Sequence, residues 1–171
     1  MALNATLSAS DANSYVTRAD ADAYFTDRMH SSAWTALTDT AIKDGLLMTS
    51  SQMLDWYINW KGDKATVAQS MQWPRSGAIR PDGTEIDDDV LPPEIKTAVY
   101  EFALVNVEAD RMEDDPLAGI GQLRAGSLMI KAGAEKPNQT NAKPVPDQIY
   151  RILSDLFNQG SSISVVRLLR A

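Results

Sequence analysis

The spacing of apolar residues predicts that most of the chain folds into amphipathic helices. Between positions 39 and 62, apolar side chains recur at intervals of four and three residues, which places them on one face of a helix. Asp39 precedes this pattern as an N-cap, and Gly62 follows it as a C-terminal stop. The predicted stripe consists of Ile42, Leu46, Thr49, Met53 and Trp56, widened by Leu47, Leu54 and Tyr57.

Similar signals predict shorter helices on either side. Thr17 is an N-cap with Asp20 in the first turn, so a helix is expected up to about residue 28. Ser31 or Ser32 starts a short helical turn that carries Trp34. A last helix follows Asp147, and its apolar face repeats at i, i+3, i+4, i+7 and i+8. This face consists of Ile149, Ile152, Leu153, Leu156 and Phe157.

The most apolar helix is expected after two prolines. Pro92 and Pro93 precede Glu94, a favourable helix start, and the pattern continues to about Arg111. Apolar residues lie nearly all round its axis, which is typical of a helix that is central to a bundle or shared with a neighbouring subunit. We expect a subunit interface on this helix, formed by Ile95, Val99 and Phe102.

The segment between these helices predicts turns and short strands. A fixed structural turn is expected at Trp73, Pro74, Arg75 and Gly77, because the proline sets φ and favours an extended residue before it. A small β-hairpin is expected at residues 78–86, around a Pro-Asp-Gly turn. Residues 123–134, which contain glycine bends, are predicted to form one extended strand.

These elements define a mainly α fold: a small helical bundle with a short β-hairpin, an extended strand segment and a C-terminal arm. We expect a helical domain at residues 1–134, with the hairpin inserted at about 78–86. A Pro-, Asn- and Lys-rich linker follows at 135–146. Residues 147–171 then supply the last helix and the extended docking arm.

Residues 161–171, here called the C-terminal arm, are β-rich, apolar and basic. Apolar side chains at four positions would be costly to leave in water, and two arginines offer charge to an acidic surface. Two interpretations stay open: an arm that docks on another protein, or a last strand that returns to its own domain. The binding residues would be Val165, Val166, Arg167, Leu168, Leu169 and Arg170.

The composition limits the range of functions that the chain can have. The length of 171 residues suits one domain, and the absence of cysteine excludes disulfides and thiolate chemistry. A net charge of −7 opposes phosphate binding over the surface as a whole. No apolar run approaches the roughly 20 residues of a membrane span, and the N-terminus lacks a signal-peptide pattern. We therefore expect a soluble protein that is not secreted and does not contact membrane.

Few residues suggest catalysis. His30 is the only histidine, and the chain lacks a Gly-x-Ser-x-Gly elbow and the glycine-rich phosphate loops. We expect no enzymatic activity, no cofactor and no metal. The tryptophans, Trp34, Trp56, Trp60 and Trp73, have lysines and arginines nearby and are typical of a stacking platform for single-stranded nucleic acid. Core packing is the alternative that their positions favour.

Several short blocks together resemble one family. They are residues 13–25 (NSYVTRADADAYF), 72–77 (QWPRSG), 91–95 (LPPEI) and 165–170 (VVRLLR), together with the Asp82-Gly83 hairpin. This pattern, which covers nearly the whole chain, resembles the head–tail adaptor (connector) proteins of tailed bacteriophages. Related sequences often carry the label DnaT-like single-stranded DNA-binding protein.

The resemblance implies a role in the virion, at the junction of head and tail. Such proteins form a ring, typically of twelve copies, beneath the portal protein. Their C-terminal segment grips the portal, and a neck or tail-completion protein docks on the far side. DNA would be only passing cargo, and the protein would be made in the host bacterial cytoplasm. The alternative that the label suggests is a single-stranded DNA-binding module.

Overall fold

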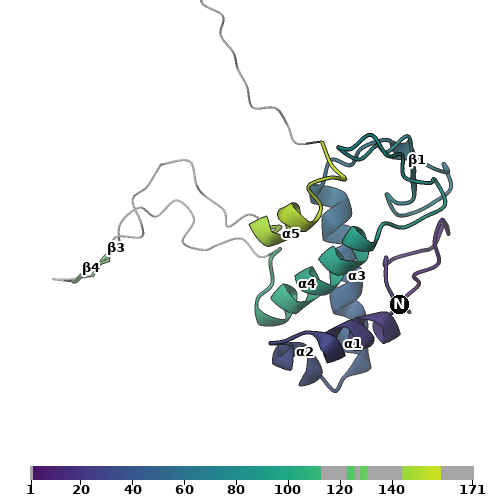
Figure 1. Ribbon diagram of the computed structural model, residues 1–171. Helices are drawn as coiled ribbons and strands as arrows, with labels where there is room; N and C mark the ends of the chain where they lie inside the picture. The colour runs from purple at the N-terminus through teal and green to yellow at the C-terminus, as the bar shows by residue number, and fades with distance from the viewer. Residues whose placement is uncertain (1, 113–122, 126–127, 131–143, 159–171) are drawn as a thin grey trace, which may run out of the picture.

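The computed structural model describes residues 2–112, 123–125, 128–130 and 144–158 (Figure 1). The described part is mainly helical, as predicted from the periodicity. Its helices are α1 (Arg18–Asp27), α2 (Ser32–Thr35), α3 (Thr40–Tyr57), α4 (Pro93–Glu108) and α5 (Asp147–Ile152). Its short strands are β1 (Asp63–Lys64), β2 (Arg75–Ser76), β3 (Leu123–Ala125) and β4 (Leu128–Ile130).

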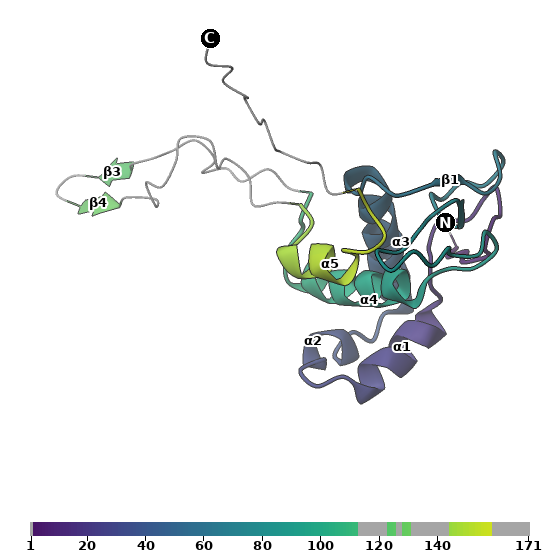
Figure 2. The ribbon, with the colours of Figure 1, turned by 45° about the horizontal axis from the view of Figure 1, so that its top comes forward.

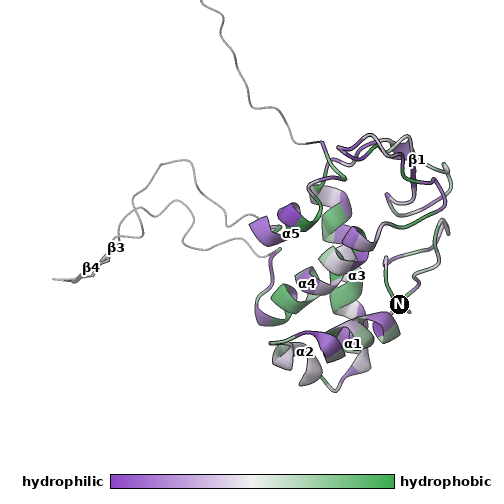
Figure 3. Cartoon of the chain, in the orientation of Figure 1, coloured by the Kyte–Doolittle hydropathy of each residue, from purple (hydrophilic) through white to green (hydrophobic). Residues whose placement is uncertain are grey.

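Helix α4 lies at the centre of the bundle. It crosses and packs against α3 and also contacts α2 and α5 (Figure 2). Figure 3 shows hydrophobic residues, in green, on both α3 and α4. The buried positions of α4 are Ile95, Ala98, Val99, Tyr100, Glu101, Phe102 and Ala103. The nearly all-round apolar pattern is therefore explained by a central place in the bundle.

The predicted subunit interface on α4 is wrong as placed. Ile95, Val99 and Phe102 are fully buried inside the chain's own core and present no surface to a neighbour. Apolar residues on most faces of a helix indicate either a central helix or a shared one, and here the chain itself covers α4 with α2, α3 and α5.

The buried face of α3 differs from the predicted stripe. Its predicted ends, Ile42 and Trp56, are 51% and 60% exposed, and the buried face includes two serines instead. Ser51 Oγ donates to the Leu47 carbonyl oxygen, and Ser50 Oγ accepts a hydrogen bond from Asn106 Nδ2 at 2.9 Å. These bonds satisfy both hydroxyl groups in the core, so the helix buries a partly polar face that an apolar pattern cannot reveal.

Two of the predicted helix starts, at Thr17 and Asp39, are confirmed by capping bonds, whereas Asp147, the predicted cap of the last helix, is the first residue of α5, and Pro146 is its N-cap. Thr17 accepts from the backbone N–H of Asp20 at 3.2 Å, and Asp39 accepts from that of Ala41 at 2.8 Å. The ends are less well predicted, because α3 stops at Tyr57, before Gly62, and α5 stops at Ile152. Beyond α5, Leu153 and Leu156 remain buried in irregular backbone. An N-cap acts within its own first turn, so the sequence reveals it. The C-terminal ends of these helices depend instead on contacts with other parts of the fold.

The connector between α3 and α4 is built around one buried arginine. Arg75 donates from Nε to the Lys61 carbonyl oxygen at 2.7 Å and from a terminal nitrogen to that of Gly62. Strands β1 and β2 pair antiparallel beside these bonds. The peptide bond between Trp73 and Pro74 is cis, and of the residues predicted to form a structural turn here, Arg75 lies in strand β2 and Gly77 has a positive φ. The guanidinium thus joins the two strands of the connector.

The predicted hairpin at residues 78–86 is confirmed. The backbone N–H of Arg80 donates to Thr84 at 2.8 Å, and that of Ile86 donates to Ala78 at 2.9 Å. The extended segment predicted at 123–134 contains two strands rather than one, since β3 and β4 pair antiparallel. Val145, which belongs to the predicted linker, is buried in the core, and residues 135–143 lie outside the described residues. The C-terminal arm lies outside the described residues.

A glycine pair tests the packing of this connector. Gly62 has φ +71°, and a Cβ there would clash with the Ser76 carbonyl oxygen, whereas Gly77 has φ +68° and open space around it. We expect Gly62→Ala to lower the free energy of unfolding by about 2–4 kcal/mol and Gly77→Ala by about 1 kcal/mol. Urea unfolding of both variants measures the difference. Equal losses would show that the close approach at Gly62 is unimportant.

Candidate functional site

A surface cleft lies where the C-terminal half of α3 meets the N-terminal lead-in and the connector. Its volume is about 340 Å³, at the lower end of the range for pockets that hold small ligands, about 300–1,000 Å³. We call it the Trp56 cleft. Its lining is Ala12, Asn13, Gln52, Asp55, Trp56, Ser70, Met71 and Gln72. Three segments distant in the sequence thus form one concave surface.

Trp56 supplies the aromatic wall of this cleft. Its side chain is 60% exposed, whereas Trp34, Trp60 and Trp73 are buried. The predicted core role is therefore confirmed for three tryptophans and wrong for Trp56. A tryptophan exposed beside a cleft offers a large planar surface for stacking or for a cation.

Asp55 forms the polar wall and holds the cleft together. Its Oδ1 accepts from the Tyr15 hydroxyl, and its Oδ2 accepts from the backbone N–H of Gln72 at 2.9 Å. The Tyr15 oxygen in turn accepts from the backbone N–H of Trp73 at 3.2 Å. One carboxyl group therefore links α3 to both the lead-in and the connector.

Burial perturbs both ionisable groups of this network. Desolvation raises the pKa of Asp55 to about 6, although hydrogen bonds from Tyr15 and Gln72 favour its charged form. Desolvation, together with the neighbouring Asp55 carboxylate, raises the pKa of the Tyr15 hydroxyl well above its ordinary value. At pH 7 the cleft wall thus carries a negative charge on Asp55 and a neutral Tyr15.

Side-chain amides complete the cleft. Gln72 Oε1 accepts from an Arg75 terminal nitrogen at 3.1 Å. Within the described part of the chain, the side chains of Gln52 and Trp56 make no hydrogen bond. The cleft therefore presents an indole, the uncommitted amide of Gln52 and the carboxylate of Asp55, which suits an extended segment that is uncharged or basic.

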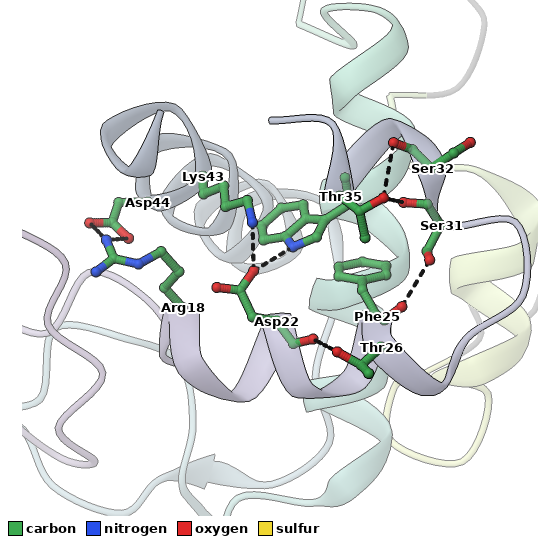
Figure 4. A network of polar contacts seen from close by, with 10 residues as sticks. Arg18, Asp22, Phe25, Thr26, Ser31, Ser32, Thr35, Lys43 and Asp44 are labelled. Atoms are coloured by element: carbon green, nitrogen blue, oxygen red, sulfur yellow. Dashed lines mark hydrogen bonds and ion pairs between the residues drawn. The ribbon is translucent and has the colours of Figure 1, made fainter. Parts of the chain in front are cut away.

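The described cations are largely committed to partners. Figure 4 shows Arg18 beside Asp44 and Lys43 beside Asp22, at 2.9 and 2.7 Å. Two further ion pairs, Arg28–Glu101 and Arg80–Glu94, join the helices and the hairpin to α4. Lys61, Lys64 and Arg75 donate to backbone carbonyl oxygens.

The ion pair inside the bundle is strongly coupled. Burial would raise the pKa of Glu101, but hydrogen bonds from Arg28 and Tyr24 hold it below its ordinary value. The hydrogen bond to Glu101 likewise raises the pKa of the Arg28 guanidinium. Both charges are therefore retained at neutral pH, and neither is available to a phosphate.

The sequence-predicted site residues fall into three groups. Ile95, Val99 and Phe102 are buried in the core, and Trp73 and Arg75 are buried in the connector. The arm residues Val165–Arg170 lie outside the described residues. The cleft residue Asp55 and its buried partner Tyr15 were not predicted, and their only sequence signal is that a carboxylate adjoins the tryptophan at the end of a helix.

Other kinds of site find no support in this structure. In the described ranges, no three His, Asp or Glu side chains are grouped so that they could hold a metal ion. None of the helices described is both long and apolar enough to cross a membrane.

Comparison with known proteins places the chain in a family. The family described as "Putative DnaT-like ssDNA binding protein" matches residues 1–171, and the chain belongs to this family. No curated protein and no solved structure matches the chain. The family description agrees with the label that the sequence resemblance indicated.

The charge state of Asp55 can be tested through stability. Its folded-state pKa of about 6 exceeds the ordinary value of 3.8, so this group favours folding at low pH and loses that contribution as pH rises towards 6. We expect Asp55→Asn, which cannot ionise, to gain about 1 kcal/mol relative to the parent protein between pH 5 and pH 7. Urea unfolding at both pH values gives this difference.

The control for that measurement is Asp89→Asn, which removes the same charge from an exposed position. Changes in other titrating groups cancel, because each variant is compared with the parent protein at the same pH. If the Asp55→Asn and parent curves run parallel from pH 5 to pH 7, the carboxyl group is not desolvated.

Proposed function

We propose that this protein is the head–tail adaptor of a tailed bacteriophage, a structural virion protein that forms a ring beneath the portal. The ring joins the capsid to the neck or tail-completion protein and lines the channel for DNA. It acts by contact and carries out no catalysis. Twelve copies are the number that the resemblance implies.

The observation that carries this proposal is that most of the described cations already have carboxylate or carbonyl partners within the chain. A channel that bound phosphates tightly would retain the genome, because each basic contact to a phosphate adds counterion-release free energy. Four of the described cations are paired with carboxylates and three donate to backbone carbonyl oxygens, and the whole chain has a net charge of −7. This distribution of charge favours a protein that binds DNA weakly and allows it to slide past.

The portal contact is assigned to the C-terminal arm. Its two arginines and four apolar side chains suit an acidic, partly apolar groove on another protein. Neighbouring subunits must use a surface other than the predicted one, since Ile95, Val99 and Phe102 are buried.

Portal binding gives a direct test. We expect the intact protein to co-sediment at physiological salt with the portal ring encoded in the same genome, at one copy per portal subunit. Replacing Val166 and Leu168 by Asp should reduce binding at least about ten-fold, because buried apolar contacts become charged. Exchanging Val67, a fully exposed residue of the connector, for Asp is the control. Unchanged binding by the arm variant would remove the anchoring role.

Single-stranded DNA binding is the second candidate, and two observations favour it. The family description names this activity, and Trp56 is an exposed aromatic on which a base can stack. Against it stands the shortage of uncommitted cations along the Trp56 cleft.

We expect no retention of oligo-dT in a filter-binding assay at low salt, where electrostatic attraction is strongest. Retention that Trp56→Ala lowers at least about ten-fold would instead establish nucleic-acid binding at the cleft, since stacking contributes about 1–3 kcal/mol per base. The matched control is Tyr57→Ala, the exposed neighbour on α3 that does not line the cleft.

A further inference from the structure

The described chain ends next to the Trp56 cleft. The backbone N–H of Asn158 donates to the Asn59 carbonyl oxygen at 2.8 Å, and Phe157 forms a β-bridge with Trp60. Asn59 lies three positions after Trp56, a separation of at most about 10 Å along the chain. Whatever follows Asn158 therefore starts beside the aromatic wall of the cleft.

The length of the following segment is sufficient to enter the cleft. Residues 159–171 can span about 40 Å when extended, at about 3.3 Å per residue. Residues 159 and 160 bridge from Asn158 to the start of the C-terminal arm. The distance from Asn59 to Trp56 is much shorter than this reach, so no rearrangement of the helical body is required.

The chemistry of the arm and that of the cleft are complementary. The arm contains two arginines and no acidic residue, and its other side chains are mostly apolar. The cleft offers the exposed face of Trp56, the thioether of Met71 and the carboxylate of Asp55. An arginine over an indole face gains a cation–π interaction, and the nearby negative charge strengthens it. Lys64 and Arg75 are not in the lining of the cleft and donate to backbone carbonyl oxygens, so neither side chain covers the Trp56 indole.

We propose that, in the free protein, the C-terminal arm folds back and occupies the Trp56 cleft of its own chain. The two arginines of the arm would supply the cation for the Trp56 indole. This inference rests on the proposed function in one respect: the arm binds the cleft first and the portal later. The arm is then held away from other proteins until a portal competes for it, which delays assembly in the absence of the portal.

Acrylamide quenching of tryptophan fluorescence tests the proposal without a portal, so its failure is separate from failure of the adaptor role. Trp56 dominates quenching because the other tryptophans are buried. We expect Arg167→Glu with Arg170→Glu, in the full-length chain, to raise the quenching constant about two-fold by freeing the indole face. A synthetic peptide of residues 161–171 added to this variant should restore protection.

The matched control changes two exposed cations elsewhere, Lys96→Glu with Arg151→Glu, and should leave quenching at the parent value. Trp56→Phe should abolish the difference between the arm variant and the parent protein. Equal quenching by the parent and the arm variant would overturn the proposal. Protection that appears only as protein concentration rises would also overturn it, because the occupant would then be the arm of a second copy.

Discussion

The burial of α4 is the constraint on which the rest of the structure depends. A helix that is apolar on most faces must be covered on most faces, and α2, α3 and α5 do so. The one charged residue inside this packing, Glu101, is compensated by the Arg28 guanidinium and the Tyr24 hydroxyl. Breaking that pair would leave a buried charge, which costs far more than an exposed pair contributes. The pair thereby fixes α1 against α4, and α1 cannot shift along the bundle without exposing it.

Local signals in the sequence were sufficient to predict the starts of α1 and α3 and the hairpin. They were insufficient to predict which face of α3 is buried and where α3 and α5 end. Thr17 and Asp39 each accept a backbone N–H from the first turn of the helix that they cap, so their capping roles could be predicted from the sequence. The buried face of α3 includes Ser50 and Ser51, whose hydroxyl groups are satisfied by Asn106 of another helix and by Leu47. A hydrophobic pattern assigns such positions to solvent, so the predicted stripe was rotated and Trp56 was placed in the core.

The Trp56 cleft was beyond sequence prediction for a different reason. Its key contact joins Tyr15 to Asp55, forty positions apart, and its floor comes from a third segment. The spacing of apolar residues along the chain does not predict a contact between residues so far apart. Strands β1 and β2 pose the same difficulty, since each is two residues long and is defined by its pairing and by the Arg75 side chain. What could be predicted was the surrounding turn, because a proline and a glycine restrict their own backbone.

The bridge between Phe157 and Trp60 has a mechanical consequence. Residues 156–158 are bonded to residues 59–61, which follow directly on α3, and Leu153 and Leu156 are buried behind them. Tension applied to the C-terminal end of the chain would reach these backbone bonds first, before α5 bears any load. From there it would pass into α3, the longest helix, and be spread across the core. The force would therefore enter the body of the protein at the end of α3 rather than through the short helix α5.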